Sequence, residues 1–173
     1  MLKLREAEQS FTLITGKEAF ISGIELIELI RTVFAKGACF RIKVSGYSML
    51  PFIRNSDVVT ISGLYNSSLD IGKVVAFIDL NVNKLTIHRI IGTNNGAYLI
   101  KGENVFNSDG WVPRENILGC VTKIERNGRA IFLGLGRERL IIALFSRIRI
   151  WYLLLRLWRL LPPPIASAIM SRI

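Results

Sequence analysis

The chain has 173 residues, half of them hydrophobic, which is enough for one domain with a buried core and a short appendage. Its net charge of +10 is uneven: residues 1–125 carry 14 Lys and Arg against 12 Asp and Glu, whereas residues 126–173 carry nine Arg against one Glu. Large aliphatic and aromatic residues separate these arginines, which favours a membrane surface and argues against a nucleic-acid partner. One histidine and two cysteines cannot supply an ordinary four-ligand zinc site, so we expect no metal and no cofactor.

The first predicted element is an amphipathic helix over residues 17–36. Its hydrophobic side chains recur at helical spacing and Gly37 follows as a stop. The members of this apolar side are Ile24, Ile27, Ile30 and Phe34. Neither this helix nor the segment before it has an apolar run long enough to span a membrane. We therefore expect no ordinary N-terminal transmembrane anchor.

From Phe40 to about Leu133 the sequence consists of short β-branched runs separated by turn residues. The predicted strands are FRIKVSG, DVVTIS, KVVAFIDL, KLTIHRII, AYLIKG, ILGCVTKIER and RAIFLG. The predicted turns between them are Asn66-Ser67-Ser68, Asn94-Asn95-Gly96 and Asn127-Gly128. This pattern predicts a mainly β fold, an antiparallel β domain with a leading amphipathic helix.

A second amphipathic helix is predicted over residues 140–161. One strip carries Arg149, Tyr152, Arg156 and Arg159, and Leu and Ile occupy the remainder. In a spanning helix each central arginine would cost about 2.5–3.5 kcal/mol, while each Leu, Ile or Phe would return only about 0.3–0.6 kcal/mol. We therefore expect this helix to lie in the membrane interface. Packing on the body of the protein is the alternative interpretation.

Three segments carry candidate chemistry. In Ser45-Gly46-Tyr47-Ser48-Met49-Leu50-Pro51, a serine follows a glycine turn at the end of a strand, where its hydroxyl can face a cleft. The only histidine, His88, lies in a predicted strand among aliphatic residues. Lys101-Gly102-Glu103-Asn104 leads to Asp109, a carboxylate that could orient an imidazole. Taken singly, these are equally a turn serine, a core histidine and a solvated loop acid.

Together, and in this order, the three segments resemble the superfamily that joins type I signal peptidases to self-cleaving SOS-type repressors. The resemblance covers roughly residues 40–125, and a histidine followed by arginine is similar to the Ser-His branch of the endoplasmic reticulum, archaea and sporulation. It implies a serine endopeptidase that cleaves signal or leader peptides at a membrane. The implied catalytic residues are Ser48 as nucleophile, His88 as base and Asp109 as third member.

The resemblance also implies finer features of the site. The backbone N–H of Ser48 would stabilise the oxyanion, and Met49 and Leu50 would lie near shallow substrate pockets. Ser45 stands three residues before Ser48, whereas signal peptidases often have a serine two before, so its part in the oxyanion hole stays open. Glu103 stands where the family usually has Asp.

The predicted elements and the resemblance together divide the chain into three parts. Residues 1–39 form an N-terminal segment with the first helix, residues 40–135 a catalytic β domain, and residues 136–173 a basic membrane-associating tail. The expected partners are a peptide or preprotein substrate and membrane lipids through residues 140–161. The tail also suggests docking beside a membrane transporter or secretion partner.

Two other functions fit the same fold. A repressor-type self-cleaver needs a DNA-binding helix-turn-helix and a cleavable linker, for which the segment before Phe40 offers little room. A non-catalytic, membrane-associated peptide-binding relative would hold extended peptides by strand addition. Such a binder would have no need to keep Ser48, His88 and Asp109.

Overall fold

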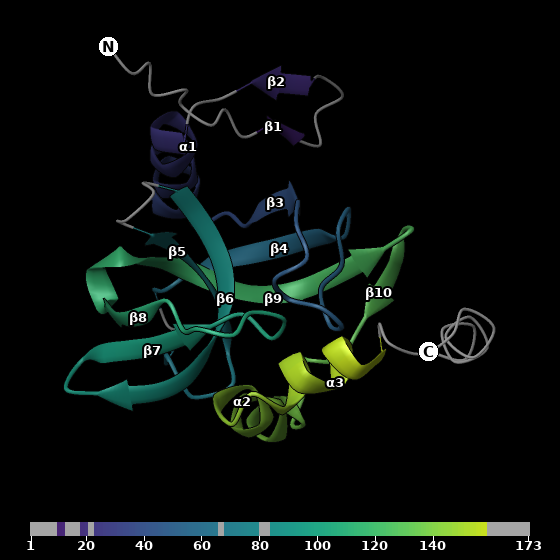
Figure 1. Ribbon diagram of the computed structural model, residues 1–173. Coiled ribbons are helices and arrows are strands. Elements are labelled where there is room, and N and C mark those ends of the chain that lie inside the picture. Colours follow the sequence, from purple (N-terminus) through teal and green to yellow (C-terminus); the bar gives the residue numbers. More distant parts are fainter. Residues whose placement is uncertain (1–9, 13–17, 21–22, 66–67, 80–83, 159–173) are drawn as a thin grey trace, which may run out of the picture.

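The computed structural model describes residues 10–12, 18–20, 23–65, 68–79 and 84–158. Its body is an eight-stranded antiparallel sheet in the order β3-β4-β9-β5-β6-β7-β8, with β10 paired to β9 (Figure 1). The strands are β3 (Phe40–Lys43), β4 (Val58–Gly63), β5 (Val74–Asp79), β6 (Lys84–Asn94), β7 (Ala97–Lys101), β8 (Gly110–Pro113), β9 (Ile117–Arg126) and β10 (Arg129–Ile131). A short 3-10 helix, η1 (Arg114–Asn116), joins β8 to β9. The predicted mainly β fold is confirmed.

Each of the seven predicted strands is present, and two of the predicted turns explain their pairing. Asn95 and Gly96 have φ angles of 45° and 80°, and Asn127 and Gly128 have φ angles of 50° and 76°. Positive φ at both central residues is typical of the tight hairpin turn that Asn-Gly pairs favour. These turns fold β6 onto β7 and β9 onto β10. Residues 66–67 of the third predicted turn lie outside the described residues.

Strand β8 was not predicted from the sequence. It has only four residues, begins with Gly110 and ends with Pro113, and both residue types weaken a strand prediction. Pairing with β7 stabilises it nevertheless, because Tyr98 and Leu99 lie opposite Val112 and Trp111. Since Asp109 directly precedes β8, this missed strand is what holds that carboxylate beside the sheet.

The leading helix, α1 (Gly23–Ala35), is shorter than predicted. The prediction that helix begins at residue 17 is wrong, because Glu18–Phe20 form β2, which pairs with β1 (Ser10–Thr12). A segment as short as Glu18–Phe20 fits the two-residue period of a strand as well as the helical period. Periodicity alone therefore placed the start of the helix too early.

The apolar side predicted for α1 faces the sheet. Of the predicted residues, Ile27, Ile30 and Phe34 are buried in the larger hydrophobic cluster, and Gly37 follows the helix with a φ of 70°. The side chain of Ile24 lies outside the described residues.

A helical segment near the C-terminal end is also present, but it is not one continuous helix. α2 (Arg139–Arg147) and α3 (Ile150–Trp158) are separated at Arg149, whose φ of 64° is left-handed and interrupts a right-handed helix. The helical period passes through this position unbroken, so the sequence pattern contains no signal for the break. Arg159 and the following residues lie outside the described part of the chain.

The two C-terminal helices lie on the opposite side of the sheet from α1 (Figure 1). α2 packs against β6 and buries Ile142, Ala143 and Ser146. The alternative interpretation, packing on the body of the protein, therefore holds for this side of α2. Among the described residues, no helix combines the length and the apolar character needed to cross a membrane.

The sheet has hydrophobic clusters on both faces, and β5 contributes to both. Val74, Ala76 and Ile78 join the cluster beneath α1, whereas Val75 and Phe77 join the second cluster. Because successive side chains of a strand point to opposite faces, a strand covered on both sides is hydrophobic at every position. This explains why the segment KVVAFIDL shows no alternation.

We predict that Gly119→Ala destabilises the fold by about 2–3 kcal/mol, as overpacking of a filled core does. A Cβ at Gly119 would collide with the backbone carbonyl oxygen of Ser62 in the paired strand β4, which cannot move away without breaking the pairing. Unfolding in urea measures the loss.

Gly92→Ala, also in a strand of the sheet, is the matched control for this change. A Cβ at Gly92 would meet nothing closer than the Leu99 Cβ at 3.5 Å, an ordinary van der Waals contact. We expect a loss below about 1 kcal/mol for the control. Equal losses in the two variants would contradict the proposed backbone clash.

Candidate active site

Ser48 lies in the loop between β3 and β4, at the start of a tight turn. The N–H groups of Phe52 and Ile53 both donate to the Met49 carbonyl at 3.1 Å, which closes this turn. Just before it, Gly46 has a φ of 114°, a conformation that residues with a Cβ rarely adopt. The Gly46 N–H donates to the Asn55 side chain at 3.1 Å. The loop therefore presents Ser48, which is half-buried, at a defined position.

His88 lies in the first half of β6 and pairs with Asp109. Its Nδ1 is 2.7 Å from the Asp109 Oδ2, and the two side chains are 8% and 17% exposed. A carboxylate that holds Nδ1 orients the imidazole and favours the tautomer whose Nε2 is the free acceptor. The structure thus brings together two of the three residues predicted as catalytic, which are 21 positions apart in the chain.

Gly102 lies between this ring and Ser48. A Cβ on Gly102 would be 2.8 Å from the carbonyl oxygen of Ser48 and 2.9 Å from Nε2 of His88. The main chain of Ser48 and the free ring nitrogen therefore approach the same point. Among the described residues no hydrogen bond joins the Ser48 hydroxyl to His88. Contacts of this kind are often long without substrate and shorten when it binds.

Asn104 ties the loop after β7 to the segment of Ser48. Its N–H donates to the Ser48 carbonyl at 2.7 Å, and its side-chain Nδ2 donates to the Tyr47 carbonyl at 3.0 Å. One loop therefore holds Ser48 at its start and supplies Asp109 at its end. Asn104 was not predicted as a site residue, because its partners lie more than 50 positions away in the sequence. Its position directly after Gly102-Glu103 was the one sequence feature that could have indicated a role.

Lys101 stabilises the same loop from within. Its side chain is buried, and Nζ donates to the backbone carbonyls of Gly102, at 3.2 Å, and of Val105. Burial lowers the pKa of the Lys101 ammonium, and the nearby Glu103 carboxylate partly offsets this effect. These contacts make Lys101 a clamp for the loop backbone.

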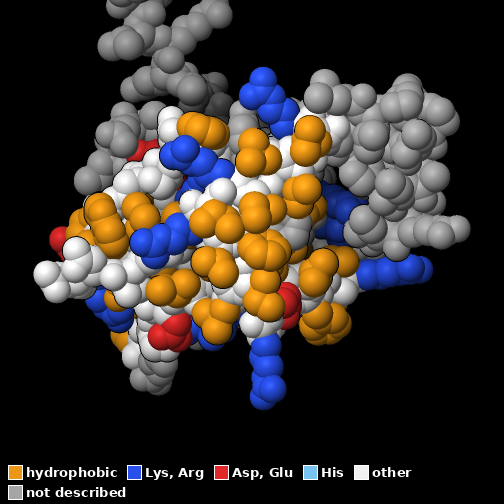
Figure 2. All heavy atoms as spheres, turned by 60° about the horizontal axis from the view of Figure 1, so that its bottom comes forward, with side chains coloured by type: hydrophobic (Ala, Val, Ile, Leu, Met, Phe, Trp, Pro, Cys, Tyr) orange, Lys and Arg blue, Asp and Glu red, His pale blue; other side chains and the backbone are white. Residues whose placement is uncertain are grey.

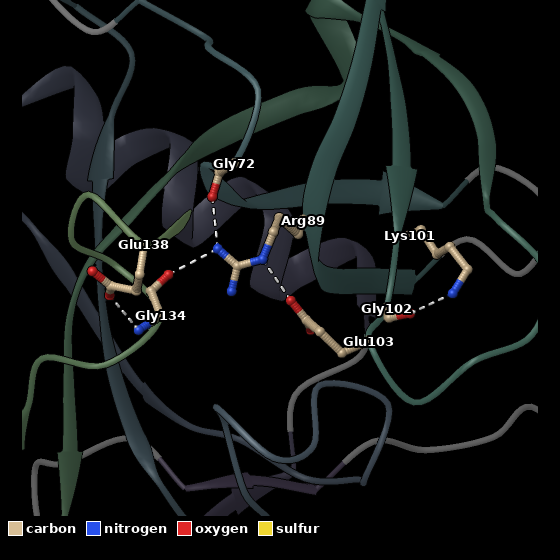
Figure 3. Close-up of polar contacts among 7 residues, drawn as sticks. All are labelled: Gly72, Arg89, Lys101, Gly102, Glu103, Gly134 and Glu138. Atoms are coloured by element: carbon tan, nitrogen blue, oxygen red, sulfur yellow. Dashed lines mark hydrogen bonds and ion pairs between the residues drawn. The ribbon is translucent and has the colours of Figure 1, made fainter. Parts of the chain in front are cut away.

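Arg89, the residue after His88, forms a fully buried ion pair with Glu103 (Figure 3). Its Nε is 2.5 Å from the Glu103 Oε1, and Nη1 donates to the carbonyls of Gly72 and Gly134 at 2.6 Å and 2.8 Å. Burial raises the pKa of the Glu103 carboxyl, and Arg89 opposes that rise. Glu in place of the family's usual Asp therefore reaches the arginine and supports the loop.

A cavity of about 490 Å³ opens beside these residues. One wall is β3 with the segment up to Gly46, and the other is the first half of β6, Lys84 to His88. In the described sheet β3 is an edge strand, and residues 84–88 pair only with β5, so each wall presents an unpaired strand edge. Ser48 and Asp109 line the same cavity.

The remaining predicted site residues, Ser45, Met49 and Leu50, differ in whether they line the cavity. Ser45 is exposed and lines the cavity, as does the buried Met49. Leu50 is half-buried and is not part of the lining formed by the described residues. Within the described residues, no three His, Cys, Asp or Glu side chains gather closely enough to hold a metal ion.

We predict that Arg89→Met makes the stability of the protein more sensitive to pH. Without Arg89 the burial of Glu103 loses its main opposing effects, the charge and the hydrogen bond of Arg89, so the folded-state pKa of Glu103 rises further above the unfolded value of about 4.3. Between these two values the folded state keeps a proton that the unfolded state has released, so the free energy of unfolding falls as pH rises.

From about pH 5 to about pH 8 the variant should lose at least about 1.4 kcal/mol more than the wild type, the equivalent of one pKa unit. Urea unfolding at both pH values measures the difference. Arg89→Met combined with Glu103→Gln is the control, because it has no carboxyl left to titrate. If the single and double variants showed the same pH dependence, Glu103 would not be its source.

Comparison with known proteins is consistent with this geometry. The family model described as Peptidase S24-like matches residues 12–118, well over half of the chain. The matched range includes β3 to β8 and every residue of the constellation around Ser48, His88 and Asp109. No curated protein matches the chain. From the fold, the site and the family match together, the chain belongs to the Peptidase S24-like family.

Proposed function

We propose that the chain is a serine endopeptidase of the signal-peptidase type, which cleaves signal or leader peptides at a membrane with Ser48, His88 and Asp109. The observation that carries this proposal is the 2.7 Å contact between His88 and Asp109 beside the cavity that Ser48 lines. Membership of a peptidase family supports the reaction class. The proposal goes beyond family membership in two respects: the kind of peptide that is cut, and the location of cleavage at a membrane.

In the proposed mechanism Ser48 is the nucleophile. A serine hydroxyl is weakly nucleophilic at neutral pH, so the Nε2 of His88 removes its proton as the oxygen attacks the scissile carbonyl. The imidazolium then returns this proton to the leaving amine. Asp109 keeps the ring in the productive tautomer and stabilises its positive charge. Water repeats the sequence on the acyl-enzyme and releases Ser48.

The oxyanion of the tetrahedral intermediate requires a hydrogen-bond donor that is not already used. The backbone N–H of Ser48 donates to no other described backbone group, which leaves it free for this role. Such donors act on charge that appears only in the transition state, so they lower the barrier without tightening substrate binding. Ser45, exposed at the cavity wall, is another hydroxyl whose contribution to the oxyanion hole can be measured.

The cavity suits a substrate in extended conformation. Its two walls are unpaired strand edges, so a peptide between them can form main-chain hydrogen bonds on both sides. Main-chain bonding is independent of sequence, and side-chain selection then depends on pockets such as the one beside Met49. This arrangement supports a peptide or preprotein as substrate.

We predict that Ser48→Ala and His88→Ala each reduce kcat/KM by at least about a thousandfold, because either change removes the attacking unit. Asp109→Asn should reduce it by about 10²–10⁴-fold, since the amide favours the wrong tautomer of the ring. The assay is mass spectrometry of a short-peptide library incubated with full-length protein in lipid vesicles.

Thr86→Val is the matched control, because it removes a hydroxyl to which no role is given from the lining of the same cavity, and it should retain cleavage within about tenfold. A larger loss in Ser45→Ala would assign the Ser45 hydroxyl to the oxyanion hole. The intact mass of the wild-type chain over time shows whether it cuts itself, as a repressor-type self-cleaver would. If the folded protein bound library peptides but Ser48→Ala cut them as fast as the wild type, the mechanism would be wrong. Binding with no cleavage by the wild type would instead indicate the non-catalytic relative.

Gly102→Ala provides an independent geometric test. The added methyl group would enter the space between the Ser48 carbonyl and the His88 Nε2, within 3 Å of both. Even small misplacement of reacting groups is costly, so kcat should fall by about 10²-fold with a smaller change in KM. Thermal unfolding of the variant separates this effect from a loss of fold. Unchanged kcat would show that the two groups meet elsewhere.

A further inference from the structure

The C-terminal helices leave a hydrophobic surface uncovered. Ile142, Ala143 and Ser146 fix one side of α2 to the body. The opposite side of α2 and the outer side of α3 expose large aliphatic residues, each at least half exposed: Leu140, Ile141, Leu144, Ile148, Leu153, Leu154 and Leu157. Figure 2 shows hydrophobic side chains gathered over these two helices, with Lys and Arg around them. We call these seven residues the apolar face.

The charges on the two helices have one sign. Residues 139–158 contain four arginines and no Asp or Glu. Arg147, Arg149 and Arg156 are exposed. An amphipathic surface with aliphatic residues in the middle and arginines beside them suits the interface of an anionic bilayer, where the arginine stems lie along the apolar region and the guanidinium groups reach the headgroups.

A second copy of the chain is a poorer occupant of this surface. In a symmetric dimer the same patch meets itself, so the arginines of one copy would face those of the other. Like charges brought together at an interface cost several kcal/mol, and the two helices carry no carboxylate to compensate. Charge complementarity therefore selects a negatively charged partner.

We propose that the apolar face is the docking surface of this protein for an anionic lipid membrane. The inference extends the membrane setting of the proposed function by naming the surface and the lipid class. It does not depend on the chemistry of Ser48.

A cation–π contact joins the docking surface to the loop that shapes the site. Arg149, at the break between α2 and α3, places its guanidinium 4.1 Å from the ring of Phe106. Phe106 belongs to the loop that contains Asn104 and ends at Asp109. Docking through the two helices therefore places the loop that shapes the active site close to the lipid surface.

The test is flotation of full-length protein with vesicles of phosphatidylcholine alone or mixed equally with phosphatidylglycerol. We expect binding to the mixed vesicles that weakens as salt is raised. Leu144→Gln combined with Leu153→Gln should lower the partition coefficient at least about tenfold, because two half-exposed leucines no longer insert. Arg147→Gln combined with Arg156→Gln should lower it roughly fivefold per arginine, on the anionic vesicles only.

Tyr65→Gln is the matched control. Tyr65 is also a large exposed hydrophobic residue, but it lies beside Arg31 and Phe34 of α1, on the other side of the molecule from α2 (Figure 1). Its replacement should leave vesicle binding unchanged. Ser48→Ala should also bind as the wild type does, which separates this inference from the proposed catalysis.

Three outcomes would overturn the proposal. The first is equal binding by the wild type and the Leu144/Leu153 variant, provided that circular dichroism shows both to be folded. The second is equal binding to the two kinds of vesicle. The third is a dimer in analytical ultracentrifugation that the leucine changes dissociate, with no vesicle binding, which would identify a second copy as the occupant.

Discussion

The structure depends on a positive charge that has no access to water. The guanidinium of Arg89 is fully buried, and a buried charge must be paired and hydrogen-bonded within the protein. Its partners come from three other segments: Glu103 in the loop after β7, Gly72 before β5, and Gly134 before α2. The contacts of this one charge therefore set the mutual positions of four segments, although the Arg89 Nη2 and the Glu103 Oε2 have no hydrogen-bond partner among the described residues. Because Arg89 directly follows His88, this fixed point is adjacent to the imidazole.

The same arrangement relates the site to the C-terminal helices. The N–H groups of Gly134 and Gly136 donate to the Glu138 carboxylate. The pKa of Glu138 is lowered first by a hydrogen bond from its own backbone and then by these two. Glu138 immediately precedes α2, so the segment that supplies a carbonyl to Arg89 also sets where α2 begins. The C-terminal helices are thus attached to the body of the protein through polar contacts of their own, and only their outer side remains available for other surfaces.

Local features of the fold were predictable from the sequence, whereas long-range ones were not. Asn-Gly pairs have their own conformational preference, so the hairpins at Asn95 and Asn127 could be located without knowledge of the rest of the chain. The candidate residues Ser48, His88 and Asp109 were predicted from motif resemblance, and the structure brings His88 and Asp109 into contact. By contrast, the Asn104 clamp joins residues more than 50 positions apart, and the break at Arg149 interrupts a regular helical period. Strand β8 exists because β7 is there to pair with it.

Under the proposed peptidase activity, the two unpaired strand edges that bound the cavity limit which polypeptides can be cut. A polypeptide can bond to both edges only when it is fully extended, so a helical segment must unwind before its peptide bond reaches Ser48. Unwinding is easiest where helix propensity is low: glycine costs a helix about 1 kcal/mol and proline about 3 kcal/mol relative to alanine. A leader that is helical along most of its length would therefore be recognised at its least helical point. The conformational preference of the substrate then becomes part of the cleavage rule, alongside its side chains.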